Sequence, residues 1–196
     1  MKLIVASNNA KKRKEIAAIL GALGVKLVTA EETVFVDVIE DADSFAGNAR
    51  KKAEAFAHAN HLPALADDSG LCVDALDGAP GIYSSRYAGI DGNDNANNAK
   101  LLEELAGIEN RTAHFACALH LAFPDNRPPI TAEAQVNGEI LTAAVGDSGF
   151  GYDPLFFCPE LGKAFAKASP EEKASVSHRG RALRKLAEQL RPHEMI

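Results

Sequence analysis

The sequence lacks the cysteine patterns of disulfide-stapled and zinc-binding proteins. Its three cysteines, Cys72, Cys117 and Cys158, are far apart and include no CxxC or Cys/His spacing. An odd number of scattered cysteines indicates neither a disulfide framework nor a structural zinc site. We therefore expect a reducing compartment, the cytoplasm.

Long apolar runs are also missing. The apolar start of the chain turns polar at Ser7, and His114 and His120 interrupt the longest later run. The first run is too short for a secretory signal, and a membrane span needs about 18 apolar residues. We expect neither export nor membrane insertion.

The chain has no excess of positive charge. Its 196 residues include 21 Lys and Arg against 27 Asp and Glu, which gives a formal net charge of -6. Binders of nucleic-acid polymers are typically basic, so this class is not expected. The charge is segregated, because bases dominate residues 2–14 and 163–191 whereas residues 31–43 and 67–77 contain acids and no base. Basic ends with an acidic middle suit a metal-bound anion.

The common nucleotide-binding motifs are absent too. The chain contains no GxxxxGK[ST] segment, and Gly149-Phe150-Gly151 has Pro154 where a dinucleotide fingerprint needs its third glycine. A P-loop kinase or a Rossmann dehydrogenase is therefore not expected.

Hydrophobic periodicity predicts one α/β domain over residues 1–196, with a mixed sheet folded into two lobes. The predicted strands include residues 3–6, 25–29 and 114–123, and the predicted helices cover residues 16–23, 44–60, 93–105 and a segment from 178 onward. Ser169-Pro170-Glu171-Glu172 has the capping-box pattern and predicts a further helix start.

Two turn-forming segments are predicted to interrupt strands. Asn137-Gly138 favours a tight type I′ hairpin, and Asp67-Asp68-Ser69-Gly70 favours a turn between two short strands. The second would place two carboxylates and a hydroxyl where they could bind Mg²⁺ through hard oxygen ligands. Taken alone, such a segment is more often a polar turn.

Two more segments carry groups suited to a nucleotide. Ser7-Asn8-Asn9-Ala10-Lys11-Lys12 joins a strand end to a helix start, where backbone N–H groups and an ammonium could converge on phosphate oxygens. The aromatic and acidic loop Phe150-Gly151-Tyr152-Asp153 and the donors His178-Arg179 could sandwich and recognise a planar base. Taken alone, residues 7–12 are also typical of any capped helix start. The aromatic loop is also typical of core aromatics, and His178-Arg179 is typical of a helix start at the surface.

Seven motifs occur in order along nearly the whole chain. They are S-x-N-x-x-K (Ser7, Asn9, Lys12), N-A-x-x-K-A (48–53), A-D-D-S-G-L (66–71), G-A-P-G-I-Y-S-x-R-Y (78–87), G-F-G-Y-D-P (149–154), E-E-K (171–173) and S-H-R (177–179). With them the chain resembles the inosine/xanthosine triphosphate pyrophosphatase family, the house-cleaning enzymes for noncanonical purine nucleotides.

The resemblance implies an elongated mixed sheet with two lobes around a central cleft, a homodimer, and hydrolysis of ITP, dITP and XTP to the monophosphate and pyrophosphate. It implies Mg²⁺, with Mn²⁺ as a substitute. It implies Asp68 as general base and metal ligand, with Glu40 and Asp67 as metal or water partners. The implied triphosphate contacts are Ser7, Asn9, Lys12, Lys52, Ser69 and Lys173, and the implied base pocket comprises Phe150, Gly151, Tyr152, Asp153, His178 and Arg179. Asn8, Ala10 and Lys11 are predicted as further substrate-binding residues.

The chain departs from the family pattern at two places. Gly47 stands where bacterial relatives typically have Glu in E-N-A, and Asn8-Asn9 with Lys11 stands where relatives often show G-N-x-G-K, so Lys12 keeps the spacing of the phosphate lysine. Two other functions are weighed. A Maf-like pyrophosphatase of other nucleotides is disfavoured by S-H-R and F-G-Y-D. For a nucleotide sensor without turnover, Asp68→Asn would change nothing kinetically, whereas in an enzyme it should abolish turnover and retain binding.

Overall fold

Short apolar runs form one mixed sheet in the computed structural model, which describes residues 2–125 and 127–190. Residues 1, 126 and 191–196, which the single-domain prediction includes, lie outside the described residues. Within the described chain the strand order is β2-β1-β3-β4-β5-β6-β7. The strands are β1 (Lys2–Val5), β2 (Lys26–Leu27), β3 (Ala64–Val73), β4 (Thr112–Ala122), β5 (Ile130–Ile140), β6 (Phe156–Cys158) and β7 (Lys163–Ala164). β1 pairs in parallel with β2 and β3, whereas β6 pairs antiparallel with β5 and β7.

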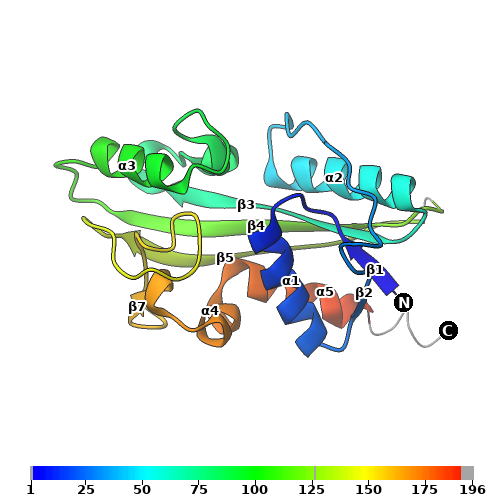
Figure 1. The fold of residues 1–196 in the computed structure, drawn as a ribbon. Helices are drawn as coiled ribbons and strands as arrows, with labels where there is room; N and C mark the ends of the chain where they lie inside the picture. The colour runs from blue at the N-terminus through cyan, green and yellow to red at the C-terminus, as the bar shows by residue number, and fades with distance from the viewer. Residues whose placement is uncertain (1, 126, 191–196) are drawn as a thin grey trace. The chain divides into compact units, whose positions relative to one another are not determined.

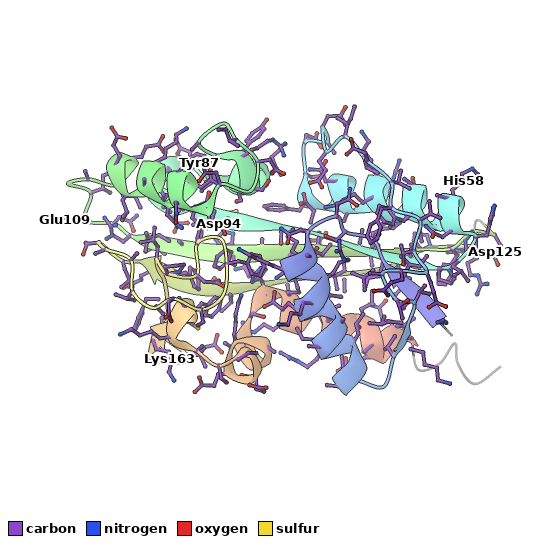
Figure 2. The ribbon with its side chains drawn as sticks, viewed as in Figure 1. His58, Tyr87, Asp94, Glu109, Asp125 and Lys163 are labelled. Carbon is purple, nitrogen blue, oxygen red and sulfur yellow. The ribbon has the colours of Figure 1, made fainter. Side chains whose placement is uncertain are left out.

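Most α-helices of the described chain begin directly after a polar capping residue. The helices are α1 (Ala10–Ala22), α2 (Phe45–Asn60), α3 (Asp94–Glu104), α4 (Pro170–Val176) and α5 (His178–Leu190). Side chains of Asn9, Ser44, Asn93 and Ser169 accept backbone N–H bonds at the starts of the first four, and the predicted capping box at Ser169 is confirmed. Asp94 lies in the first turn of α3, where a negative charge favours the helix (Figure 2).

The described residues group into two compact units. Unit 1 contains residues 2–68, 117–134 without residue 126, and 179–190, and unit 2 contains Ser69–Ala116 and Gln135–His178. Within unit 1, α2 lies on one face of the sheet and α1 and α5 on the other (Figure 1). Each face therefore receives side chains from different helices.

Each unit has its own apolar core. In unit 1, Ile4, Ala64 and Ala122 of the sheet pack with Phe56 of α2. The core of unit 2 joins Leu71 and Val73 to residues of α3 and to an aromatic group in which Phe115, Phe156 and Phe165 contact one another.

Both predicted strand interruptions are wrong. β3 runs without a break from Ala64 to Val73 through Asp67 and Asp68, and β5 runs through Asn137-Gly138 to Ile140. A Cβ atom on Gly138 would lie 2.4 Å from the carbonyl oxygen of Phe157, so this glycine allows β6 to approach rather than forming a turn. Within the strand, the carboxylates of Asp67 and Asp68 are paired with Arg179 and Lys52, so they do not need an exposed turn to remain charged.

No helix in the described ranges is long and apolar enough to cross a membrane. The three cysteines are free thiols; Cys117 and Cys158 are buried and Cys72 is partly buried.

Candidate functional site

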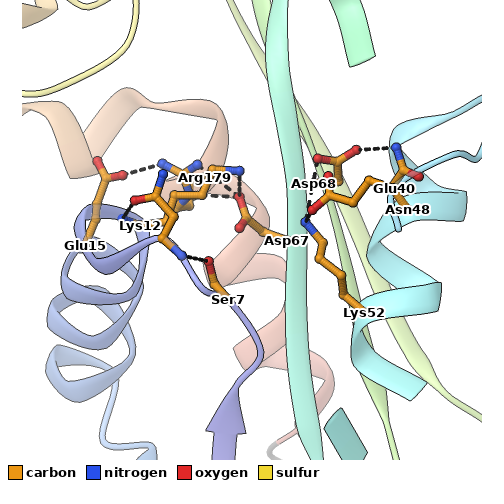
Figure 3. A network of polar contacts seen from close by, with 10 residues as sticks. Ser7, Lys12, Glu15, Glu40, Asn48, Lys52, Asp67, Asp68 and Arg179 are labelled. Carbon is orange, nitrogen blue, oxygen red and sulfur yellow. Dashed lines mark hydrogen bonds and ion pairs between the residues drawn. The ribbon is translucent and has the colours of Figure 1, made fainter. Parts of the chain in front are cut away.

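β3 carries the centre of a polar network in unit 1, which we call the β3 ionic cluster (Figure 3). Its members are Ser7, Lys12, Glu15, Glu40, Asn48, Lys52, Asp67, Asp68 and Arg179. Consecutive strand residues point to opposite faces of a sheet. Asp67 accordingly faces α1 and α5, and Asp68 faces α2 (Figure 3).

On the Asp67 face, two cations surround one fully buried carboxylate. Arg179 donates from Nε and Nη2 to Asp67 Oδ2 over 3.1 and 2.9 Å, and Lys12 Nζ lies 3.6 Å from the same oxygen. The Nη1 group of Arg179 also binds Glu15, from α1. Arg179, predicted in the base pocket, is 2% exposed and belongs to this ionic group.

The pKa values on this face follow from burial and pairing. Burial alone would raise the pKa of Asp67, but the charges of Lys12 and Arg179 outweigh it and hold that pKa well below its usual range. Burial likewise opposes the charged form of Arg179, yet Asp67 and Glu15 raise its pKa. Asp67 and Arg179 therefore form a fully ionised buried pair at neutral pH.

On the Asp68 face, two carboxylates share one ammonium. Lys52 Nζ lies 2.9 Å from Glu40 Oε1 and 3.8 Å from Asp68 Oδ1, and Asn48 donates to Asp68 Oδ2 over 3.1 Å. Asn48 is held in turn by the backbone N–H of Ala42. This face therefore carries one more negative than positive charge.

Burial and the nearby Glu40 raise the pKa of Asp68, although Lys52 and Asn48 oppose the shift. An additional cation here would offset the excess negative charge. Within the described residues no three His, Cys, Asp or Glu side chains gather as a metal site. Mg²⁺, however, is commonly held by one or two carboxylates together with substrate phosphates and waters, and Asp68 and Glu40 fit that donor set. Asp67, also predicted as a metal or water partner, faces the opposite side of β3, where its Oδ2 atom is paired with Arg179 and Lys12.

The junction of β1 and α1 is ordered by its own polar residues. Ser7 Oγ accepts the N–H of Asn9, and Asn9 Oδ1 accepts the N–H of Lys12 over 3.1 Å. Asn8 donates to the carbonyl of Val36. Asn8, Asn9, Ala10 and Lys11 are exposed, whereas Lys12 is turned toward Asp67. The start of α1 thus presents backbone N–H groups beside a lysine, an arrangement suited to anions.

In unit 2, the segment 149–153, which we call the base loop, is fixed through Asp153. Its Oδ2 atom accepts from the N–H of Phe150 over 2.9 Å and from Lys173 Nζ over 2.8 Å. Lys173 Nζ also lies 4.9 Å from the centroid of the Phe150 ring. Gly149 is required beside this carboxylate, because a Cβ atom on it would lie 2.2 Å from Asp153 Oδ2.

The other predicted residues of unit 2 are held within its core. Tyr152 is 4% exposed and donates its hydroxyl to the carbonyl of Ser84 over 2.7 Å. The ring of His178 stacks on Phe115, with centroids 4.8 Å apart. Ser69 is partly buried in β3. The predicted residues of unit 1 therefore gather around β3 and the start of α1, whereas in unit 2 the residues shown in contact are Phe150, Asp153 and Lys173.

Comparison with known proteins agrees with this arrangement of motifs. The model of the Ham1 family matches residues 3–189. The chain belongs to the Ham1 family.

Individual Ham1-family relatives match along nearly their whole length. The dITP/XTP pyrophosphatase of Desulforamulus reducens is 50% identical over 191 residues, covering 96% of this chain and 94% of the relative. That of Nitrosomonas europaea is 45% identical over 196 residues and covers 100% and 97%. The solved Ham1 protein of Staphylococcus aureus superposes with a TM-score of 0.86 at 39% identity, covering 98% of this chain and 100% of that one. The family and the mixed α/β fold predicted from the ordered motifs are confirmed.

In this Ham1-family chain, the departure at Gly47 has a packing counterpart. A Cβ atom at position 47 would lie 2.8 Å from the Cβ of Ala42 and 3.1 Å from Ser44 Oγ. The segment before α2 therefore packs directly against this glycine. Ser44 Oγ accepts the N–H of Gly47, which caps the helix.

Sequence reasoning gave no role to several residues that hold the two clusters. Glu15 lies within α1, and nothing in its local sequence signals its bond to Arg179, which is 164 residues further along the chain. Asp94 and Asn98 had a usable signal, since two polar residues four apart share one face of a helix.

Proposed function

We propose that this chain hydrolyses noncanonical purine nucleoside triphosphates, ITP, dITP and XTP, to the monophosphate and pyrophosphate. The observation that carries the proposal is the identity of about half the residues, over nearly the full length of this chain, to curated relatives named dITP/XTP pyrophosphatase. The paired ionic groups on β3 supply the acids and lysines that such a reaction needs.

Asp68 is proposed as the general base. Water must lose a proton as it attacks phosphorus, and a carboxylate with a raised pKa accepts that proton more readily than an ordinary one. Asn48 holds one Asp68 oxygen at 3.1 Å and so orients the carboxylate. Asp67, paired with Lys12 and Arg179, serves here to hold these cations in place.

The triphosphate is proposed to bind near the lysines of the β3 ionic cluster and the start of α1. Lys12 lies beside Asp67 and Lys52 beside Asp68 on the opposite face of β3, and the charges of both lysines act on Asp68. Asp68 and Glu40 would hold Mg²⁺, which when bound neutralises charge developing on phosphate oxygens. Lys52 already neutralises part of the charge of these two carboxylates.

The base is proposed to bind against the base loop. Hypoxanthine and xanthine carry a 6-keto acceptor where adenine carries an amino donor, so donor groups near the base discriminate between them. A buried donor left unpaired costs about 1–3 kcal/mol, which disfavours ATP. Phe150 offers a half-buried ring, and His178 is the predicted donor in unit 2.

A nucleotide panel with pyrophosphate detection tests the proposal. ITP, dITP and XTP with Mg²⁺ should give one pyrophosphate per monophosphate, faster than GTP or ATP. Release of orthophosphate alone, or equal rates for all purines, would overturn it. An Asp68→Asn variant that binds ITP without turnover separates the enzyme from a nucleotide sensor.

We further propose a homodimer in the cytoplasm, with Mn²⁺ able to replace Mg²⁺. The support is the family resemblance together with the free thiols, which suit a reducing compartment. Light scattering during gel filtration should give about twice the 20.8 kDa chain mass, and a monomer would overturn the dimer.

A further inference from the structure

Both backbone groups of Gly151, at the centre of the base loop, are bound by side chains from α3. Asp94 Oδ2 accepts the Gly151 N–H over 2.9 Å, and Asn98 Nδ2 donates to the Gly151 carbonyl over 2.9 Å. Asp94 and Asn98 are four residues apart and so lie on one face of the helix. Together they clamp a single peptide segment from both sides.

Neighbouring polar residues begin α3 and hold the segment before it. Asn93 caps the helix through the N–H of Ala96, and Asn97 binds the backbone of Ala88 and Ser85. The bonds of Asp94 and Asn98 to Gly151 instead reach 57 and 53 residues further along the chain. The clamp is therefore a separate contribution of this helix.

The base loop needs such support because its backbone is not part of a helix or strand. Gly149 and Gly151 have φ values of +80° and +62°, which deprive the segment of regular hydrogen bonding. Asp153 fixes the segment at its end through Phe150 N–H and Lys173. The α3 clamp fixes it at Gly151, so the half-buried Phe150 ring is held between two anchors.

We propose that Asp94 and Asn98 are positioning residues that set the base loop for the purine, and thereby tune affinity and selectivity for the base. The inference rests on the proposed function, since it takes the loop as the base site. Neither residue needs to touch the nucleotide. Loosening the clamp should weaken recognition of the base while leaving the acids and lysines on β3 unchanged.

The test compares Asp94→Ala and Asn98→Ala with two matched variants. Asp94→Asn keeps an acceptor for Gly151 N–H but loses the charge, and Asn95→Ala makes the same truncation at an exposed position of α3. Each clamp truncation should raise KM for ITP by about three- to tenfold, the worth of one hydrogen bond, with kcat changed less than about twofold. The ITP-to-GTP ratio of kcat/KM should fall, and Asp94→Asn should restore KM.

Amide hydrogen exchange at Gly151 gives a readout that does not need turnover. Exchange should accelerate in Asp94→Ala and stay unchanged in Asn95→Ala. If Asn98→Ala does not fold, Asn98→Asp keeps the side-chain volume while removing the donor to the Gly151 carbonyl.

Each outcome decides one of the two proposals. A wild-type chain that fails to cleave ITP overturns the proposed function, whatever the variants do. An active wild type whose clamp variants match Asn95→Ala in KM and selectivity overturns the clamp. So does a loss of kcat that only follows a lowered Tm, because that result indicates support of the fold alone.

Discussion

Asp67 and Asp68 are neighbours in the sequence, but their carboxylates lie on opposite faces of β3 (Figure 3). The Asp67 carboxylate is neutralised by Arg179 and Lys12, whereas that of Asp68 shares Lys52 with Glu40. One carboxylate thus completes a buried ion pair and the other retains negative charge for chemistry. Substitutions at the two positions should therefore have separable effects.

Asp68→Asn should lower kcat for ITP by about 10²- to 10⁴-fold, the usual contribution of a general base. The amide keeps the size of the side chain and an acceptor for Asn48, so the fold should remain intact. Pyrophosphate release measures the rate, and calorimetric titration with ITP measures binding. Asp74→Asn, at an exposed acid beyond the end of β3, is the control. A wild-type kcat in Asp68→Asn would contradict the assigned role.

Asp67→Asn should destabilise the fold by about 3 kcal/mol at pH 7, because it leaves the buried Arg179 with less compensating charge. The pKa of Asp67 is lowered on folding, so its contribution is fully present above the unfolded value of 3.8 and is lost as pH falls below it. The difference in unfolding free energy between wild type and variant should therefore shrink below pH 3.8. Urea denaturation across pH measures it.

An exposed acid provides the comparison for that experiment. Asp125 pairs with Arg127 at the surface, where water screens the interaction. Asp125→Asn should leave the urea midpoint at pH 7 unchanged. Equal effects of the two substitutions would show that Asp67 is not a buried ionic partner.

Mg²⁺ should lower the pKa of Asp68. In the metal-free protein burial and Glu40 raise that pKa above 3.8, so ionising Asp68 costs stability as pH rises through its folded value. A bound cation offsets this cost, so Mg²⁺ should increase Tm more at pH 7 than at pH 4. Carboxyl NMR titration and thermal denaturation measure the two effects.

Glu40→Gln should reduce the response to Mg²⁺, because it removes one of the two carboxylates beside Lys52. It should also lower the metal-free pKa of Asp68, since the charge of Glu40 raises it. An undiminished response to Mg²⁺ in this variant would mean that the cation binds elsewhere.

Gly149→Ala should weaken the base loop more than a comparable change elsewhere. Its Cβ atom would lie 2.2 Å from Asp153 Oδ2, whereas a Cβ atom on Gly162 would meet nothing within 4 Å. Both glycines have positive φ, so Gly162→Ala carries the backbone cost alone, about 1–2 kcal/mol. Gly149→Ala should lose more stability and raise KM for ITP, whereas Gly162→Ala should leave KM unchanged.

Local signals predicted the elements that local interactions decide. Ser169 caps α4 as its capping-box pattern indicates, and the helices predicted over residues 44–60 and 93–105 are capped by Ser44 and Asn93, because each cap binds an N–H group three residues away. The ordered motifs identified the family, since seven matches in sequence are far more specific than any one.

Long-range partners decided the features that sequence reasoning missed. Asp67 and Asp68 favour a turn when considered locally, but Arg179, 112 residues from Asp67, and Lys52 stabilise their charges within a strand. Asn137-Gly138 likewise favours a turn when considered locally, but β6 packs closely against Gly138, which has no side chain, and the segment stays in β5. No periodicity within the chain encodes such distant pairings, so turn propensity alone gave the wrong structure.

The pairing of Asp67 with Arg179 also sets an order of events during synthesis. α1 and β3 leave the ribosome long before the start of α5, so the nascent chain carries Asp67 without its arginine until residue 179 has been translated. Until then Asp67 has Lys12 beside it but lacks the two hydrogen bonds from the guanidinium of Arg179, so burying the carboxylate costs more. A chain that ends before residue 179 would lack this counter-charge, so the start of α5 is needed to complete the buried pair.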